Sequence, residues 1–222
     1  MTAWRLSRMA LGLGGLLFLS LPGCTPPGPP PISVSLPPDA VQGAGDPTRA
    51  AIINTAYVFG NPGSIAGQPA EAARAVANYE YLAVELRYGP RWAGFSPLVA
   101  TEFAQGLQEV RNAVGIAPSA PPQPVIDALY AASRALRAGD TASAERILSP
   151  PLFPAGGAAT LQRLAALPLL PHANNATALA LGEMNRQDQE RERPGGFSLG
   201  RGGGGGGPPR GGGGNGGVVG WG

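Results

Sequence analysis

Prolines and glycines punctuate the middle of this chain, and their positions favour short helices. Proline opens apolar stretches at Asp46-Pro47, Pro69 and Ser96-Pro97. Its missing N–H is not needed in the first helical turn, and an aspartate or serine before it can cap that turn. Glycine-containing breaks then end these stretches at residues 60–63, 89–90 and 115. The sequence therefore predicts three helices between these points.

Apolar residues recur at helical spacing within the three stretches. The first predicted helix carries Ile52, Ile53, Ala56 and Tyr57 at this spacing. The second has apolar residues around most of its circumference, so we expect it at the centre of the domain. One face of the third consists of the apolar residues at positions 99, 103, 107, 110 and 114.

Further helical patterns follow along the chain. Pro124 begins a fourth helix that ends at Gly139, and Asp140 caps a fifth; a sixth surrounds Leu161, and a last one follows Asn175. No segment shows the sustained alternation of a strand. Short connections place successive helices antiparallel. The sequence therefore predicts an all-α fold, a small up-down helical bundle of about five to seven short helices.

The two ends of the chain differ from its middle. Glycine (35 residues) and proline (25 residues) are far above average use for a chain of 222 residues. Residues 24–45 are rich in proline, which favours an extended tether. Residues 187–222 are dominated by glycine, which favours disorder. The predicted helical domain comprises residues 46–186, and residues 1–23 form a segment of another kind.

Residues 1–23 have the three parts of an export signal. A short basic start is followed by an apolar run from Leu11 to Leu21, and then by the single cysteine of the chain, Cys24. The run is too short to cross a bilayer as a permanent helix. This region resembles the signal peptide of bacterial lipoproteins, in which the cleavage box ends in cysteine. Here the box reads Leu21-Pro22-Gly23-Cys24, with a proline where the family usually has a small residue.

The resemblance implies that Cys24 becomes the first residue of the mature chain and carries acyl groups such as palmitate. Several acyl chains bury enough methylene groups to hold a protein on a bilayer. Lipoproteins retained in the inner membrane of enteric bacteria carry aspartate after the cysteine, and Thr25 stands there instead. The resemblance thus implies a bacterial envelope protein, anchored in the outer membrane and facing the periplasm. The alternatives are an ordinary secretory signal with a chance cysteine, or a plain anchor helix.

Charge and residue content exclude several kinds of chemistry. All 16 basic residues are arginine, so neither a Schiff-base lysine nor a phosphate-loop lysine is available. Cys24 and His172 are the only residues of their types, which argues against a disulfide and a structural metal site. Residues 26–185 hold nine arginines and eleven carboxylates, so they offer no broad basic face to nucleic acid. We expect no cofactor, no metal and no nucleic-acid partner.

The most distinctive local chemistry lies in residues 79–95, where arginines stand among aromatic residues. The candidate ligand- or partner-binding patch consists of Tyr81, Arg87, Tyr88, Arg91, Trp92 and Phe95. Guanidinium groups over aromatic faces can hold an anionic or sugar ligand, or a partner protein. The alternative is that Trp92 and Phe95 close the end of the bundle while the arginines reach water.

Four glutamates are the candidates for a pair of catalytic carboxylates: Glu80, Glu85, Glu102 and Glu109. Hydrolysis would need two of them brought together, but their spacing selects no pair. Glu102 and Glu109 are expected on the solvated side of their helix. No serine lies in a nucleophile-elbow context. We therefore expect a protein that is not an enzyme.

Together these patterns predict a membrane-anchored envelope lipoprotein with a structural, scaffold or protein-interaction role. Its expected partners are the membrane, through acylated Cys24, and an envelope protein. The alternative is a small-ligand carrier or chaperone with an apolar pocket inside the bundle. That pocket would be lined by residues such as Tyr79, Leu82 and Phe103.

Overall fold

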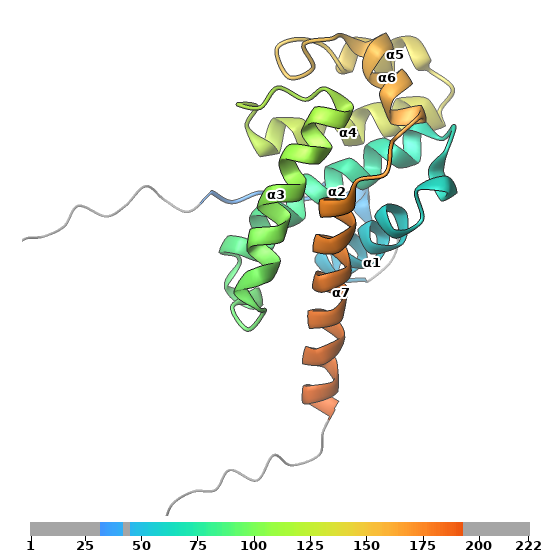
Figure 1. The fold of residues 1–222 in the computed structure, drawn as a ribbon. Helices are drawn as coiled ribbons and strands as arrows, with labels where there is room; N and C mark the ends of the chain where they lie inside the picture. Colours follow the sequence, from blue (N-terminus) through green and yellow to red (C-terminus); the bar gives the residue numbers. More distant parts are fainter. Residues whose placement is uncertain (1–31, 42–44, 193–222) are drawn as a thin grey trace, which may run out of the picture.

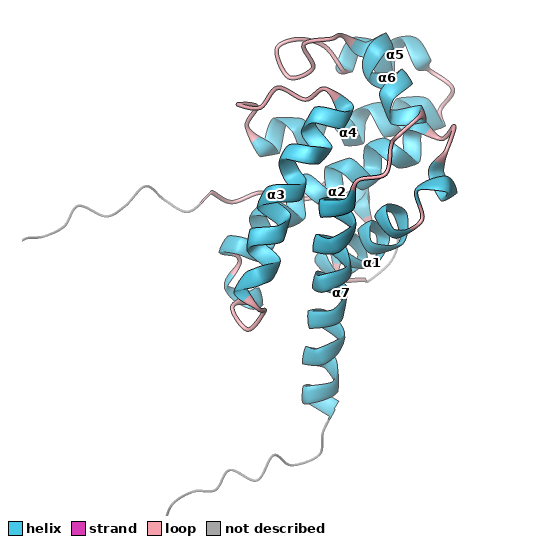
Figure 2. Ribbon diagram, viewed as in Figure 1, coloured by secondary structure: helices cyan, strands magenta, loops and turns pink. Residues whose placement is uncertain are grey.

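The computed structural model describes residues 32–41 and 45–192. Within these ranges the chain forms seven α-helices and three short 3₁₀ helices, and no strand (Figure 2). The predicted all-α helical bundle is therefore confirmed. The α-helices are α1 (Pro47–Gly60), α2 (Pro69–Tyr88), α3 (Pro97–Val114), α4 (Pro122–Arg137), α5 (Thr141–Ile147), α6 (Gly157–Ala165) and α7 (Pro171–Glu192). The 3₁₀ helices are η1 (Pro38–Ala40), η2 (Pro62–Ile65) and η3 (Pro90–Trp92).

The predicted caps Asp46 and Asp140 are present. The Asp46 carboxylate accepts hydrogen bonds from the backbone N–H groups of Thr48 (3.0 Å) and Arg49 (3.2 Å) at the start of α1. The Asp140 carboxylate accepts one from the N–H of Ser143 (2.9 Å) at the start of α5. These bonds satisfy backbone donors that have no partner within their own helix. Local sequence therefore determines where these two helices begin.

Helix α2 is the central element, as predicted. It packs against α1, α3, α4 and α6, and most of its side chains from Ala72 to Leu86 are buried. Figure 1 shows α3 and α7 side by side, with α4, α5 and α6 gathered at the top of the view. The core is continuous across these helices, so residues 45–192 behave as one packed unit rather than as separate hairpins.

The boundaries of α4 and α7 differ from the prediction. Helix α4 begins at Pro122 rather than Pro124, because a proline in the first turn removes no intrahelical hydrogen bond. Helix α7 begins at Pro171, so Asn175 lies inside the helix and does not cap it. The Glu109 carboxylate on α3 instead accepts a hydrogen bond from the N–H of Ala173 (2.9 Å). Because Glu109 and Ala173 are 64 residues apart, the local sequence around α7 could not predict this contact.

Helix α7 also continues through Glu192, so residues 187–192 are helical although we predicted them to be part of the tail. Arg49 on α1 donates to the carboxylate of Asp188 (Nη1–Oδ1 3.0 Å), and Arg186 donates to Glu190 one turn further along (2.7 Å). These pairs support the last turns of α7 at a point where the apolar pattern has ended. The remainder of the predicted tail lies outside the described residues.

Residues 32–41, which belong to the predicted extended tether of residues 24–45, lie against the helical domain. The Gln123 side chain accepts from the N–H of Ser35 (2.7 Å) and donates to its carbonyl (3.1 Å). Arg74 donates to the carbonyl of Ala40 (2.7 Å), and the Ala40 side chain is buried. This part of the chain is therefore docked on α2 and α4. Residues 24–31 lie outside the described residues.

Candidate binding site

The structure divides the predicted patch into an inner and an outer set. Tyr81, Trp92 and Phe95 are buried, with exposed fractions of 7%, 3% and 7%. Arg87, Tyr88 and Arg91 are exposed. The exposed part of the patch therefore consists of two guanidinium groups and one aromatic ring, rather than the six side chains that the sequence brings together.

The inner residues have packing partners of their own. The rings of Trp92 and Phe95 meet edge to face, with centroids 5.0 Å apart and planes at 69°. The indole N–H of Trp92 donates to the carboxylate of Glu85 (3.2 Å). This arrangement agrees with the alternative that Trp92 and Phe95 close the end of the bundle. A buried indole needs an acceptor for its N–H, and Glu85 provides it.

The outer guanidinium groups also rest on aromatic rings of the same chain. The Arg91 guanidinium lies 4.8 Å from the centroid of the Trp92 ring, and that of Arg87 lies 5.3 Å from the Tyr88 ring. Arg91 in addition forms an ion pair with Asp46 at the start of α1. Arg91 is thus largely occupied within the chain, whereas Arg87 has no carboxylate partner among the described residues.

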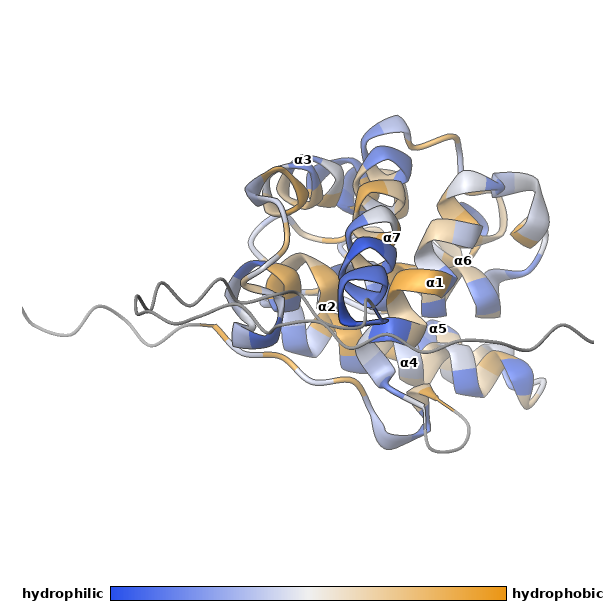
Figure 3. Cartoon of the chain, turned by 90° about the horizontal axis from the view of Figure 1, so that it is seen from below, coloured by the Kyte–Doolittle hydropathy of each residue, from blue (hydrophilic) through white to orange (hydrophobic). Residues whose placement is uncertain are grey.

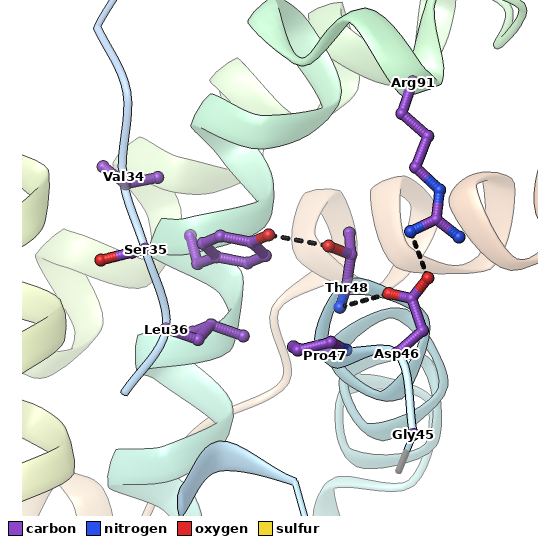
Figure 4. Close-up of a pocket in the computed structure, with 9 residues that line it drawn as sticks. Val34, Ser35, Leu36, Gly45, Asp46, Pro47, Thr48 and Arg91 are labelled. Carbon is purple, nitrogen blue, oxygen red and sulfur yellow. Dashed lines mark hydrogen bonds and ion pairs between the residues drawn. The ribbon is translucent and has the colours of Figure 1, made fainter. Parts of the chain in front are cut away.

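A pocket of about 590 Å³ lies beside this patch, between the docked N-terminal segment and the start of α1 (Figure 4). Val34 and Leu36 form one side of it and Arg91 the other. At its inner end the hydroxyl groups of Tyr81 and Thr48 share a hydrogen bond of 2.7 Å. Burial raises the pKa of Tyr81, so this hydroxyl stays protonated at neutral pH.

The charges in this pocket are already paired. The Asp46 carboxylate both caps α1 and faces Arg91, so neither group is free to bind an ionic ligand. The remaining lining is aliphatic or carries neutral hydroxyl groups. The arrangement can accept an uncharged, partly apolar group, and its open shape suits a side chain of a partner protein better than an enclosed small molecule.

A smaller groove of about 210 Å³ adjoins the patch on another side and is almost wholly apolar. Ile32, Val84, Tyr88 and Pro90 line it together with Glu85. Ile32 is 57% exposed and Tyr88 is 45% exposed. Since Ile32 begins the described chain, this groove lies where the N-terminal segment meets the domain, and Tyr88, whose ring carries the Arg87 guanidinium, is part of its lining.

A third surface, between α1 and α7, could not be predicted. The groove there has a volume of about 590 Å³ and no charged residue lines it. Its lining residues are Ile53, Ala56, Tyr57, Gly60, Asn174, Ala178, Leu181, Gly182 and Asn185. The sequence placed Ile53 and Tyr57 with the core residue Ile52, but they are 54% and 60% exposed while Ile52 is fully buried. An amphipathic pattern alone does not show which of two adjacent apolar residues points inward.

The four candidate glutamates hold the fold together through separate contacts. Glu80 is fully buried and pairs with Arg111, and Glu85 accepts from Trp92. The prediction that Glu102 and Glu109 lie on a solvated face was wrong. Both are half-buried against α7, where Glu102 accepts from the side chain of Asn175 (2.9 Å) and Glu109 caps the helix.

The three residues proposed to line an internal pocket lie in packed core. Tyr79, Leu82 and Phe103 are fully buried. The Tyr79 ring stacks on Phe103 at 4.8 Å and meets the edge of Phe59 at 5.3 Å. His172, the single histidine, is exposed and lies in the first turn of α7. The described part of the chain has no group of three potential metal-ligating side chains.

Within residues 32–41 and 45–192, no helix has both the length and the apolar character needed to span a bilayer. Cys24 and the export signal lie outside these residues. Compared with known proteins, the chain matches no family model, and no curated protein or solved structure is significantly similar to it. Functional inference therefore rests on the residues themselves.

Proposed function

We propose that this chain is a membrane-anchored bacterial envelope lipoprotein with a non-catalytic scaffold or protein-interaction role. The observation that carries the proposal is Cys24, the single cysteine, placed directly after an apolar run in the box Leu21-Pro22-Gly23-Cys24. Acylation there would fix the protein to the membrane outside the cytoplasm. With Thr25 after the cysteine, the proposed location is the outer membrane, with the helical domain in the periplasm.

The docked N-terminal segment gives this proposal a geometric consequence. Eight residue steps separate Cys24 from Ile32, and a chain of that length spans at most about 26–29 Å when fully extended. Because Ile32–Val41 is held on α2 and α4, it does not add to this reach. An acylated Cys24 would thus keep Ile32, and the groove that it lines with Tyr88, within about 26–29 Å of the bilayer surface.

The non-catalytic role is supported by the contacts of the candidate catalytic glutamates and of the charged side chains in the pocket beside α1, which all have partners within the fold. Each of the four glutamates has a structural partner, and the charges of the pocket beside α1 neutralise each other. The exposed features of the described residues include Arg87, Tyr88 and two apolar grooves. Exposed aromatic and arginine side chains around such grooves are the usual anchors of protein–protein contacts.

The anchor is tested by the mass of the mature N-terminus. Cells that produce the chain are grown with and without globomycin, which blocks removal of lipoprotein signal peptides. In untreated cells the mature chain should begin at Cys24 and carry the added mass of the acyl groups. In globomycin-treated cells the chain should keep residues 1–23. The Cys24→Ser variant should lack the mass of the acyl groups. A mature chain that begins at any other residue would refute the proposal.

The interaction role is tested by crosslinking in intact cells followed by purification of the chain. Arg87→Gln combined with Tyr88→Ser should remove a specific crosslinked envelope protein, because both side chains are exposed and unfolding is not expected. Leu169→Ser is the matched control, since Leu169 is 75% exposed and lies outside the patch. If the patch variant and the control capture the same proteins equally, the patch has no role in binding.

A further inference from the structure

The groove between α1 and α7 is an apolar surface that the described chain leaves uncovered. Its two large apolar side chains on α1, Ile53 and Tyr57, are more than half exposed, and small residues on both helices form its floor. Figure 3 shows α1 and α7 next to each other, with hydrophobic colouring on α1. Single exposed apolar residues are ordinary, but an uncharged groove of this size is a feature of binding surfaces.

We propose that Val218–Trp221 of the same chain docks in this groove. The sequence beyond residue 200 consists almost entirely of glycine, proline and arginine until Val218-Val219-Gly220-Trp221. These residues provide two branched aliphatic side chains and an indole, which suit an uncharged apolar groove. The indole ring would lie against Tyr57 and Ile53, and its N–H would have the amide oxygens of Asn174 and Asn185 as acceptors.

The length of the connecting chain fits this docking. The middle of the groove, at Leu181, lies about 16 Å from Glu192 along α7, at about 1.5 Å per residue. Residues 193–217 form the connection, and a glycine-rich chain of 25 residues has a mean end-to-end distance of roughly 25–30 Å. The connection therefore covers the span without strain. Its length gives an effective concentration of about millimolar, far above that of a second copy in a dilute solution.

The nearer apolar residues of the same region fit less well. Phe197 follows Glu192 by five residues, which span at most about 17–18 Å when fully extended. Phe197 could reach the middle of the groove only as a taut strand running back along α7, with Pro194 in its path. Val218–Trp221 has no such restriction, and it can enter the groove from either end.

Photo-crosslinking of the purified full chain tests this docking. The photoreactive residue p-benzoylphenylalanine replaces Tyr57 in one variant and Tyr88, an exposed tyrosine of another surface, in the control. We expect crosslinks from position 57 to Val218–Trp221 within one molecule, and none to this segment from position 88. Crosslinks from position 57 only to residues 197–199, or to no part of the chain beyond 192, would overturn the proposal.

Two further variants separate docking from chance contact. Gly182→Phe fills the groove, and it should fold because a Cβ at Gly182 meets no atom within 4 Å. It should abolish the crosslink, whereas Gln189→Phe, on an exposed part of α7 outside the groove, should preserve it. A crosslink that survives Gly182→Phe would overturn the proposal. In a mixture of ¹⁵N-labelled and unlabelled chains, mixed-isotope products would show a second copy in the groove and would also overturn it.

Discussion

Glu80 and Arg111 form a bidentate salt bridge inside the core of the domain. Arg111 Nε lies 2.7 Å from Glu80 Oε1, and Nη2 lies 2.6 Å from Oε2. The Glu80 side chain is fully buried, and that of Arg111 is 5% exposed. Arg111 Nη1 also donates to the carbonyls of Pro118 and Ala120 (2.9 and 3.0 Å). A single guanidinium therefore joins α2 to the loop between α3 and α4.

Arg111→Met should destabilise the protein strongly, because it leaves the Glu80 carboxylate buried without a partner. Removing one member of such a pair costs about 3–5 kcal/mol. The double variant Glu80→Leu/Arg111→Met should cost less than Arg111→Met alone, since no buried charge remains. Urea denaturation followed by circular dichroism measures both free energies. A double variant that is less stable than the single one would contradict this explanation.

The cost of Arg111→Met should also grow with pH. Burial raises the pKa of Glu80, while the hydrogen bonds and charge of Arg111 oppose that rise. Without Arg111, burial acts alone and the pKa of the folded state rises further. A raised carboxyl pKa favours the folded state below the unfolded pKa of about 4.3, and this advantage is lost as pH rises through the folded pKa. The difference in melting temperature from the parent chain should therefore be smaller at pH 4 than at pH 7.

Gly106→Ala and Gly182→Ala should have opposite effects on stability, although both lie in helices. A Cβ at Gly106 would collide with Tyr79 Oη and lie 2.9 Å from the backbone nitrogen of Ala173. Separating α3 from α7 to accommodate it should cost about 1–3 kcal/mol. A Cβ at Gly182 meets no atom within 4 Å, so the higher helix propensity of alanine should stabilise by up to about 1 kcal/mol. Equal shifts of the urea midpoint in the two variants would contradict the close approach of α3 and α7 at Gly106.

Most of the helices could be predicted from sequence because their starts are local. Asp46-Pro47 and Ser96-Pro97 contain both the cap and the first helical residue, so no distant residue is needed to place them. The start of α7 could not be predicted, because its cap is the Glu109 side chain on another helix. The docking of Ser35 depends in the same way on Gln123, which is 88 residues away in sequence. Contacts between such distant residues leave no periodic signal.

The candidate site was predictable only as a region. The chain from Tyr79 to Phe95 does supply the exposed pair Arg87 and Tyr88, yet Trp92 turns inward because Glu85 provides an acceptor for its indole. The groove between α1 and α7 depends on the relative rotation of two helices that are far apart in sequence. Composition cannot specify that rotation, because it results from how the whole core packs.

Trp92→Ala should act on stability and not selectively on binding. Trp92 is 3% exposed and packs on Phe95, and removing a buried aromatic side chain costs about 3–5 kcal/mol. Tyr88→Ala is the control in the same region, and its effect should lie within about 0.5 kcal/mol because the ring is exposed. Thermal denaturation measures both. If Trp92→Ala left the melting temperature unchanged, the packing described for η3 would be wrong.

Acid should weaken the salt bridges of the second half of α7, one within the helix (Arg186–Glu183) and one to α1 (Arg49–Asp188). Hydrogen bonds from Arg186 lower the pKa of Glu183, and those from Arg49 lower the pKa of Asp188. A lowered pKa stabilises the fold above the unfolded value of about 4, and this stabilisation is lost as pH falls through the folded pKa. The melting temperature should therefore fall below pH 4. The variant Glu183→Gln/Asp188→Asn should show a shallower fall, and an identical slope would argue against these pairs.

Gln123→Ala should release the docked N-terminal segment while leaving the helical domain folded. The Gln123 side chain pairs with both backbone groups of Ser35, so its removal leaves the segment held through Arg74 and Asp39 at its other end. Proteolysis of a loosened segment follows the population of its open form. Cleavage within residues 32–41 should therefore become faster, with the melting temperature of the domain nearly unchanged.

The control for this prediction is Gln108→Ala, at an exposed position of α3, which should leave the cleavage rate as it is. Equal cleavage rates in the two variants would mean that Gln123 does not hold this segment.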